Sequence, residues 1–304
     1  MEVVFLGTSG SVPTPERGLP AVAVRRGGEL LLLDCGEGTQ RQMMRAKVGF
    51  PTRFRIFITH LHGDHVFGIP GLLHTMALMN RDAPLEIYGP KGLANFVRTV
   101  LEVVHMKSDY PVYVREVGDG VVYDGGDYVV RACWVSHGVP ALAYAVEEKP
   151  RPGRFHPERA RALGVPIGPL WKRLQMGEAV RLPDGRLVRP EDVLGPARPG
   201  LKLVYSGDTG PCEALVELAR GADLLIHEAT LGDEHTERAI AEGHSTPSIA
   251  AQTALKAGVK RLVLTHISAR YRDTTTLLEQ ARATFPNTIV AEDLMRISLR
   301  YENR

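Results

Sequence analysis

An apolar strand that runs directly into a dense cluster of metal-binding side chains is the feature that most constrains this chain. Residues 54–59, Phe-Arg-Ile-Phe-Ile-Thr, have the composition of a buried strand. The motif His60-Leu61-His62-Gly63-Asp64-His65 follows at once. Imidazole and carboxylate groups are suitable zinc ligands, and a glycine permits a tight turn between the two halves of the motif. The alternative is that these histidines only cap a helix or lie on a polar loop.

Three further candidate ligands each follow a separate predicted strand. They are His137, Asp208 and His266, after strands at residues 128–135, 201–205 and 261–264. A lone histidine is more often structural, but side chains at several strand ends can converge on one rim. A carboxylate such as Asp208 between two cations can bridge them and lower their repulsion. We therefore predict a hydrolase site with two metal ions per chain, zinc by ligand type, with manganese as an alternative.

Short apolar runs alternate with helical patterns along most of the chain. The remaining predicted strands are residues 3–6, 30–33, 55–58, 85–88 and 223–226, and the predicted helices are residues 38–46, 66–79 and 247–257. Ser245 or Thr246 is expected to cap the last helix, with Pro247 in its first turn and Gly258 at its end. With 304 residues, 44% of them apolar, the chain can bury a substantial core. The pattern predicts an α/β fold of two packed sheets with helices outside.

Residues 149–200 interrupt this pattern with many Pro, Gly and Arg residues. They carry eleven basic side chains against five acidic ones. A long insertion in a compact domain is usually functional or disordered. We predict one domain over residues 1–304 with an inserted basic, flexible arm at 149–200. The excess of positive charge suits phosphate contact on a folded RNA, although a charge run is also typical of a solvated loop.

The bulk composition limits the partners and the compartment. The net charge is only +2, so binding of a polyanion requires a local basic patch. Cys35, Cys133 and Cys212 form no CxxC pair, which indicates a reducing compartment. The N-terminus lacks a signal-peptide pattern, and no apolar stretch approaches the ~20 residues that cross a bilayer. We expect a cytoplasmic protein without a membrane partner.

The order of the candidate ligands resembles that of the metallo-β-lactamase superfamily, whose fold is an αββα sandwich with metals at one edge. Asp34, in Asp34-Cys35-Gly36, is part of the resemblance. It implies one metal ion on His60, His62, His137 and Asp208, and a second on Asp64, His65, Asp208 and His266. His62 stands where the di-iron redox branch has Glu, which favours zinc hydrolysis.

Finer motifs resemble the ribonuclease Z family. They are His227-Glu228-Ala229-Thr230, Gly243-His244-Ser245-Thr246, Leu6-Gly7-Thr8, the run from Asp34 to Gln40, the run from His266 to Tyr271, Ala291-Glu292-Asp293, and the Gly/Pro steps at 164–166 and 168–169. This family removes the 3′ trailer from precursor transfer RNA, and its members are commonly homodimers that grip the transfer RNA body with an arm. One departure concerns the family's Pro-x-Lys-x-Arg-Asn loop for the substrate 3′ end. Here Pro15 and Gly18 replace its Lys and Asn, which leaves the cleavage position relative to CCA open.

The resemblance implies metal-hydroxide attack on phosphorus, leaving a transfer RNA 3′-hydroxyl and a trailer 5′-phosphate. Asp64 would orient the nucleophile or accept its proton. His244, supported by Glu228, would protonate the departing oxygen. The alternatives are that Glu228 only orients an imidazole and that His244 only caps the following helix. His227 is expected to be structural.

Two rival functions remain. A small-molecule hydrolase or cyclic phosphodiesterase of the same fold would keep the ligands without needing a basic arm or His244. A noncatalytic RNA-binding protein would bind zinc without hydrolysis.

Overall fold

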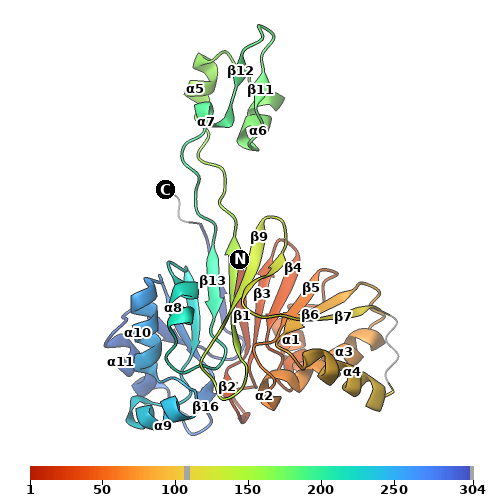
Figure 1. Cartoon of the computed structure of the whole chain (residues 1–304), viewed down its shortest axis with the longest axis vertical. Helices are drawn as coiled ribbons and strands as arrows, with labels where there is room; N and C mark the ends of the chain where they lie inside the picture. Colours follow the sequence, from red (N-terminus) through yellow and green to blue (C-terminus); the bar gives the residue numbers. More distant parts are fainter. Residues whose placement is uncertain (106–109, 302–304) are drawn as a thin grey trace. The chain divides into compact units, whose positions relative to one another are not determined.

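Two units make up the chain in this computed structural model, which describes residues 1–105 and 110–301. The larger unit runs from Met1 to Glu147 and resumes at Leu201. The smaller unit is Glu148–Gly200. Both are drawn in Figure 1, where their helices and strands are labelled.

The larger unit contains two sheets of seven strands each. The first sheet has the order β18 (Arg296–Ser298), β1 (Glu2–Gly7), β3 (Ala21–Arg26), β4 (Glu29–Leu33), β5 (Phe54–Phe57), β6 (Leu85–Gly89) and β7 (Val112–Glu116). The second has the order β17 (Thr288–Val290), β15 (Leu262–Thr265), β14 (Leu224–Glu228), β13 (Lys202–Tyr205), β10 (Leu142–Glu148), β9 (Tyr128–Trp134) and β8 (Gly120–Asp124). Strands β4 to β7 are parallel in the first sheet, and β13, β14, β15 and β17 are parallel in the second.

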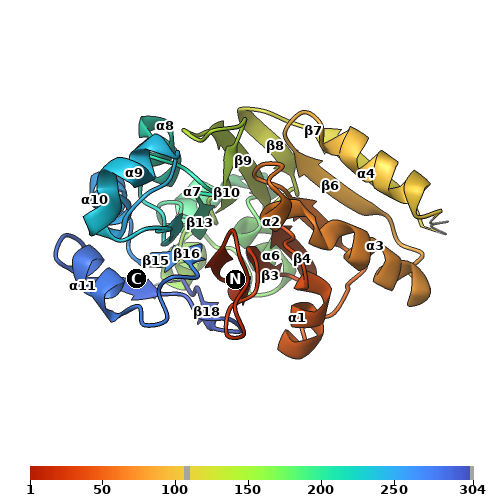
Figure 2. The ribbon, with the colours of Figure 1, turned by 90° about the horizontal axis from the view of Figure 1, so that it is seen from below.

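Helices cover the outer face of each sheet, as Figure 2 shows from below. Beside the first sheet lie α1 (Thr39–Ala46), α2 (Gly63–Val66), α3 (Gly68–Leu78) and α4 (Leu93–Val103). Beside the second lie α8 (Glu213–Ala219), the 3₁₀ turn η1 (Asp233–His235), α9 (Thr236–Ala241), α10 (Pro247–Ala257) and α11 (Thr275–Arg282). The short strands β2 (Ser9–Gly10) and β16 (Ile267–Ser268) pair in parallel. Among the described residues, no helix combines the length and apolar character that a membrane span requires.

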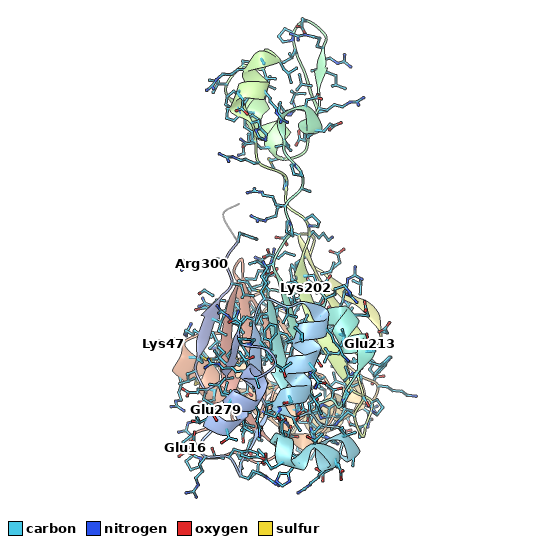
Figure 3. All side chains as sticks on the ribbon, turned by 90° about the vertical axis from the view of Figure 1, so that its left-hand side faces the viewer. Glu16, Lys47, Lys202, Glu213, Glu279 and Arg300 are labelled. Carbon is cyan, nitrogen blue, oxygen red and sulfur yellow. The ribbon has the colours of Figure 1, made fainter. Side chains whose placement is uncertain are left out.

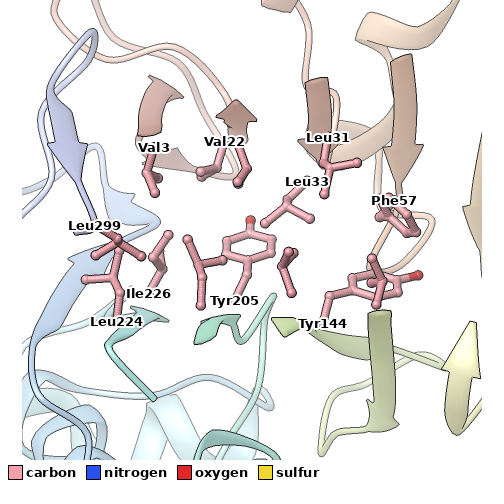
Figure 4. Close-up of a cluster of buried hydrophobic side chains, with 14 of the residues drawn as sticks. Val3, Val22, Leu31, Leu33, Phe57, Tyr144, Tyr205, Leu224, Ile226 and Leu299 are labelled. Atoms are coloured by element: carbon pink, nitrogen blue, oxygen red, sulfur yellow. The ribbon is translucent and has the colours of Figure 1, made fainter. Parts of the chain in front are cut away.

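The core between the sheets follows from the two-residue period of a strand. In β1, Val3 and Phe5 belong to the cluster between the sheets, whereas Val4 and Leu6 belong to the cluster under the helices. Figure 4 shows side chains of the first sheet meeting those of the second, including Tyr205. The predicted αββα sandwich is therefore confirmed.

Element boundaries agree with the sequence in part. The helix predicted at 247–257 has those bounds, but the predicted side-chain cap is wrong. Thr246 is at the cap position without a capping hydrogen bond, and the Ser245 hydroxyl donates instead to the Thr209 carbonyl at 2.6 Å. The helix predicted at 66–79 is split, because Phe67 lies between α2 and α3.

The smaller unit has its own elements and its own apolar cluster. It contains α5 (Pro157–Ala162), α6 (Pro169–Gln175), α7 (Pro190–Val193), β11 (Val180–Arg181) and β12 (Leu187–Val188). Its cluster consists of Ala160, Val165, Leu174, Val180, Leu182, Val188 and Val193. Residues 148–200 therefore bury apolar surface among themselves.

Candidate metal centre and active site

The candidate ligands lie at strand ends along one edge of the larger unit. His60 follows β5, His137 follows β9, Asp208 follows β13, and His266 lies between β15 and β16. The carboxyl ends of neighbouring parallel strands share one edge of a sheet, which is where open α/β folds place their ligands. Figure 1 labels α2, β2 and β16 close together at this edge, where β2 pairs with β16.

Three histidines form the first group of converging side chains. Nε2 of His60 lies 3.0 Å from Nδ1 of His62. Nδ1 of His62 lies 3.3 Å from Nε2 of His137. The carboxylate of Asp208 adjoins this group, with Oδ2 at 3.7 Å from Nε2 of His60.

A second group shares Asp208. Its Oδ2 lies 3.4 Å from Nε2 of His65 and 3.3 Å from Nε2 of His266. Those two nitrogens are 3.4 Å apart, and Oδ2 of Asp64 lies 3.5 Å from Nε2 of His266. Oδ2 of Asp208 therefore stands between the two groups.

The donor sets fit divalent cations. In tetrahedral zinc with Zn–N near 2.0–2.1 Å, two nitrogen ligands lie about 3.3 Å apart, and the nitrogen separations within the groups are 3.0–3.4 Å. Oδ1 of Asp208 is buried without a hydrogen-bond partner among the described residues, a costly arrangement that a cation relieves. These groups are therefore compatible with a metal-binding site.

Partners behind the ligands set the orientation of several rings. Nδ1 of His65 lies 2.7 Å from Oδ2 of Asp34, which also accepts the Tyr205 hydroxyl at 2.9 Å. Nδ1 of His137 lies 2.8 Å from the Gly243 carbonyl. Hydrogen bonds of this kind select the ring tautomer and aim the opposite nitrogen at the site. Asp34 belongs to the sequence resemblance, but its contact with His65 is not evident from the sequence.

The protonation states at the site suit cation binding. Burial and the positive charge of nearby His65 lower the pKa of His60 to about 2, which keeps its ring neutral. Burial alone would raise the pKa of Asp208, but the imidazoles of His266 and His65 hold it well below its usual range. Burial also opposes charge on His65, yet Asp208 and Asp34 raise its pKa well above the ordinary value. The carboxylates therefore favour positive charge here, which is what a bound cation would provide.

A histidine–carboxylate pair lies next to the two groups. Nδ1 of His244 is 2.9 Å from Oε1 of Glu228, whose side chain is buried at the end of β14. The ring centroid of His244 is 5.0 Å from that of His137 and 5.7 Å from that of His266. Burial would lower the pKa of His244, but the hydrogen bond and charge of Glu228 raise it to about 9.

Other residues singled out in the sequence have different surroundings. His227 is buried, with Nδ1 2.8 Å from the Glu228 carbonyl oxygen. The Tyr271 hydroxyl accepts the Gly232 N–H at 2.8 Å and donates to Glu234 at 2.8 Å. His227 thus lies within β14, whereas Tyr271 joins two residues of the loop around η1.

The loop after β2, which includes Ser11 and is called the N-terminal loop below, makes a backbone contact that the sequence does not predict. The Ser11 N–H donates to Oδ2 of Asp64 at 2.9 Å, and a main-chain donor leaves no signal in residue type. The same loop lines a pocket of about 600 Å³, bounded by Pro13, Thr14, Pro15, Glu16, Arg17, Ser268, Ala269, Tyr271 and Arg272. Pro15, one of the two positions that differ from the family loop, therefore lines this pocket. The loop on one side of the pocket contacts Asp64 through Ser11, and the segment on the other side begins two residues after His266.

The αββα fold and the paired His/Asp groups define a protein of the metallo-β-lactamase class. In agreement, residues 181–267 match the beta-lactamase superfamily domain, and residues 1–108 match the family described as anti-Pycsar protein Apyc1. A relative from Methanosarcina acetivorans, "Ribonuclease Z", is 50% identical over 302 residues, with 99% of each chain covered. One of the same name from Gemmatimonas aurantiaca is 49% identical, covering 98% of this chain and 95% of its own.

A solved structure gives the same result. The human tRNase Z, short form, is 33% identical with a TM-score of 0.74, over 99% of this chain and 100% of that one. The chain belongs to the ribonuclease Z family, and the family resemblance found in the sequence is confirmed.

Proposed function

We propose that this protein is a zinc-dependent endoribonuclease that removes the 3′ trailer of precursor transfer RNA. The observation that carries the proposal is the position of Asp208, which adjoins both histidine groups beside the His244–Glu228 pair. The substrate class is supported by the full-length similarity to proteins named ribonuclease Z.

The ligand assignment follows the two groups. One zinc ion would be held by His60, His62, His137 and Asp208, and the other by Asp64, His65, Asp208 and His266. Two bound cations would supply a hydroxide nucleophile near neutral pH and neutralise charge on the phosphoryl oxygens. Manganese is an alternative occupant of the same oxygen and nitrogen ligands.

Asp64 acts on the attacking side of the phosphate. The Ser11 N–H holds its Oδ2 toward the second group. From this position the carboxylate would orient the attacking water or accept its proton. The Ser11 contact thereby links the N-terminal loop to the chemistry.

His244 acts on the leaving side. Its Nδ1 donates to Glu228, so its Nε2 remains to donate a proton to the departing 3′ oxygen. The products are a transfer RNA 3′-hydroxyl and a trailer 5′-phosphate. The neighbouring 2′-hydroxyl takes no part.

The smaller unit would bind the body of the transfer RNA. Its nitrogen-bearing side chains are visible in Figure 3. Arg154, Arg159 and Lys172 are exposed and, within the described residues, make no ion pair. By contrast, Arg173 is bound to Glu178 at 2.9 Å. Unpaired cations on a surface are available to phosphates, which supply most of the affinity for a nucleic acid.

A homodimer is the proposed assembly. Leu78 near the end of α3 and Val103 at the end of α4 are each 71% exposed, and exposed apolar side chains on neighbouring helices are typical of an interface. Light scattering coupled to size exclusion tests it, since a monomer mass would contradict the proposal. A cytoplasmic location fits the three free cysteines.

The test is incubation of the zinc-loaded protein with a 3′-extended transfer RNA precursor, with both product ends mapped. One cut near the acceptor end, leaving a 3′-hydroxyl and a 5′-phosphate, is the expected result. The same map places the cut relative to CCA, which the replacements at Pro15 and Gly18 leave open. If the zinc-loaded and manganese-loaded proteins both leave the precursor intact, the small-molecule hydrolase or the noncatalytic RNA-binding protein takes its place.

A further inference from the structure

Thr230, in the loop after β14, contacts three members of the site with one hydroxyl group. Its Oγ1 lies 2.7 Å from Oε2 of Glu228 and 2.7 Å from Nδ1 of His266. It lies 3.3 Å from Nδ1 of His244. Thr230 is 7% exposed, so water does not readily replace these contacts.

The direction of the hydrogen bonds follows from the chemistry of the partners. Nε2 of His266 faces Asp208 and Asp64, so its lone pair is the one available to a cation. Nδ1 of His266 then carries the ring proton and donates it to Thr230 Oγ1. The ionised Glu228 only accepts, so the Thr230 hydroxyl donates to it. The result is a one-way chain from His266 through Thr230 to Glu228.

Glu228 completes the connection to the acid. Its Oε1 accepts Nδ1–H of His244 at 2.9 Å and the Thr209 N–H at 3.1 Å. Its Oε2 accepts the Thr230 N–H at 3.0 Å in addition to the hydroxyl. One buried carboxylate therefore orients His244 with one oxygen and supports His266, through Thr230, with the other.

We propose that Thr230 is a positioning residue that joins the cation-binding histidine His266 to the acid pair of Glu228 and His244. The proposal rests on the metal centre assigned under the proposed function. Loss of the hydroxyl leaves Nδ1–H of His266 without an acceptor and removes one donor from Glu228. The cation at the second group and the orientation of His244 therefore depend on the same oxygen atom.

The experiment titrates zinc alone into the metal-free full-length protein by calorimetry. Thr230→Val keeps the shape of the side chain and removes the hydroxyl. Removing such an outer partner typically weakens metal affinity ten- to a hundredfold, so one of the two zinc-binding steps is expected to weaken by that factor. Thr230→Ser restores the hydroxyl and should bind both ions almost as the unaltered chain does. At saturating zinc, kcat on the precursor should still fall for Thr230→Val and recover for Thr230→Ser.

A control is available two residues after His244. The Thr246 hydroxyl is buried without a hydrogen-bond partner among the described residues, so Thr246→Val removes a hydroxyl but no such contact. It should leave zinc binding unchanged. Normal binding of both ions by Thr230→Val, or equal weakening in Thr230→Ser, would overturn the proposal. If Thr230→Val does not fold, Thr230→Ala compared with Thr230→Ser isolates the same hydroxyl.

Zinc binding is measured without RNA. The result therefore stands even where the proposed cleavage of precursor transfer RNA fails.

Discussion

Oε1 of Glu228 lies 2.9 Å from Nδ1 of His244, and no hydrogen bond to the opposite ring nitrogen is formed within the part of the chain that the structure describes. His244→Ala should lower kcat by about 10²–10⁴, the usual contribution of a general acid, because the leaving oxygen loses its proton donor. Both zinc ions should remain, as measured by metal analysis of the same sample. Full activity in this variant would remove His244 from the mechanism.

The same pair predicts the alkaline limit of activity. The raised pKa of His244, about 9, keeps the acid protonated at neutral pH, and the active form is lost as the pH rises through that value. Glu228→Gln removes the negative charge that stabilises the protonated ring, so the pKa of His244 should fall. A profile of kcat against pH should show the alkaline limb moving to lower pH. If the alkaline limb stays at the same pH in Glu228→Gln, a group other than His244 causes it.

Zinc removal should affect stability as well as activity. His62→Ala removes a nitrogen from the first group, so the zinc content should fall from two ions toward one with loss of cleavage. A ligand that binds only the folded state, at a free concentration of 100 times its Kd, raises the free energy of unfolding by about 2.7 kcal/mol. Chelation should accordingly lower the Tm measured by scanning calorimetry. A Tm that does not respond to zinc would contradict a centre formed by the folded chain.

The smaller unit should act on affinity for RNA and leave the chemical step unchanged. Replacing Arg154, Arg159 and Lys172 with Ala should raise KM for the precursor, with little change for a small phosphodiester. Each lost phosphate contact should also reduce the slope of log K against log salt by about one. Arg173→Ala is the matched control, since Glu178 already occupies that guanidinium. Equal effects on both substrates would exclude the RNA-binding role.

Gly243 contacts His137, a proposed metal ligand, and directly precedes His244, the proposed acid. Its φ is +72°, and an added Cβ would lie 2.9 Å from Cα of His137. Gly243→Ala should displace His137 and His244 together and lower both zinc content and kcat. Gly221, at φ +66° with nothing within 4 Å of an added Cβ, controls for backbone strain alone. Similar losses in Gly221→Ala would mean that strain, rather than the contact, is responsible.

The sandwich and the set of converging side chains could be predicted because both leave strong patterns in the sequence. Apolar runs mark β1 and β4, and the ligand motif follows β5 directly. The β3 strand was missed, since its Ala residues are weak strand formers. The metal and acid roles of the site residues remain predictions, which the experiments above address.

The supporting contacts could not be predicted, because they join residues distant in sequence. Asp34 meets His65 across 31 positions, and Thr230 meets His266 across 36. His266 also has φ +57°, a conformation that residue type alone does not indicate for histidine. Such contacts depend on the folded chain bringing strand ends to one edge.

The inserted unit begins and ends on neighbouring strands, since Glu147 of β10 pairs with Lys202 of β13. Asp208 follows the opposite end of β13, so the chain rejoins the sheet at the end of β13 away from Asp208. Residues 148–200 can therefore be lengthened, shortened or exchanged in evolution, because a hairpin loop is enough to connect the neighbouring antiparallel strands β10 and β13. The proposed RNA-binding and cleavage roles could then change independently of each other in one polypeptide.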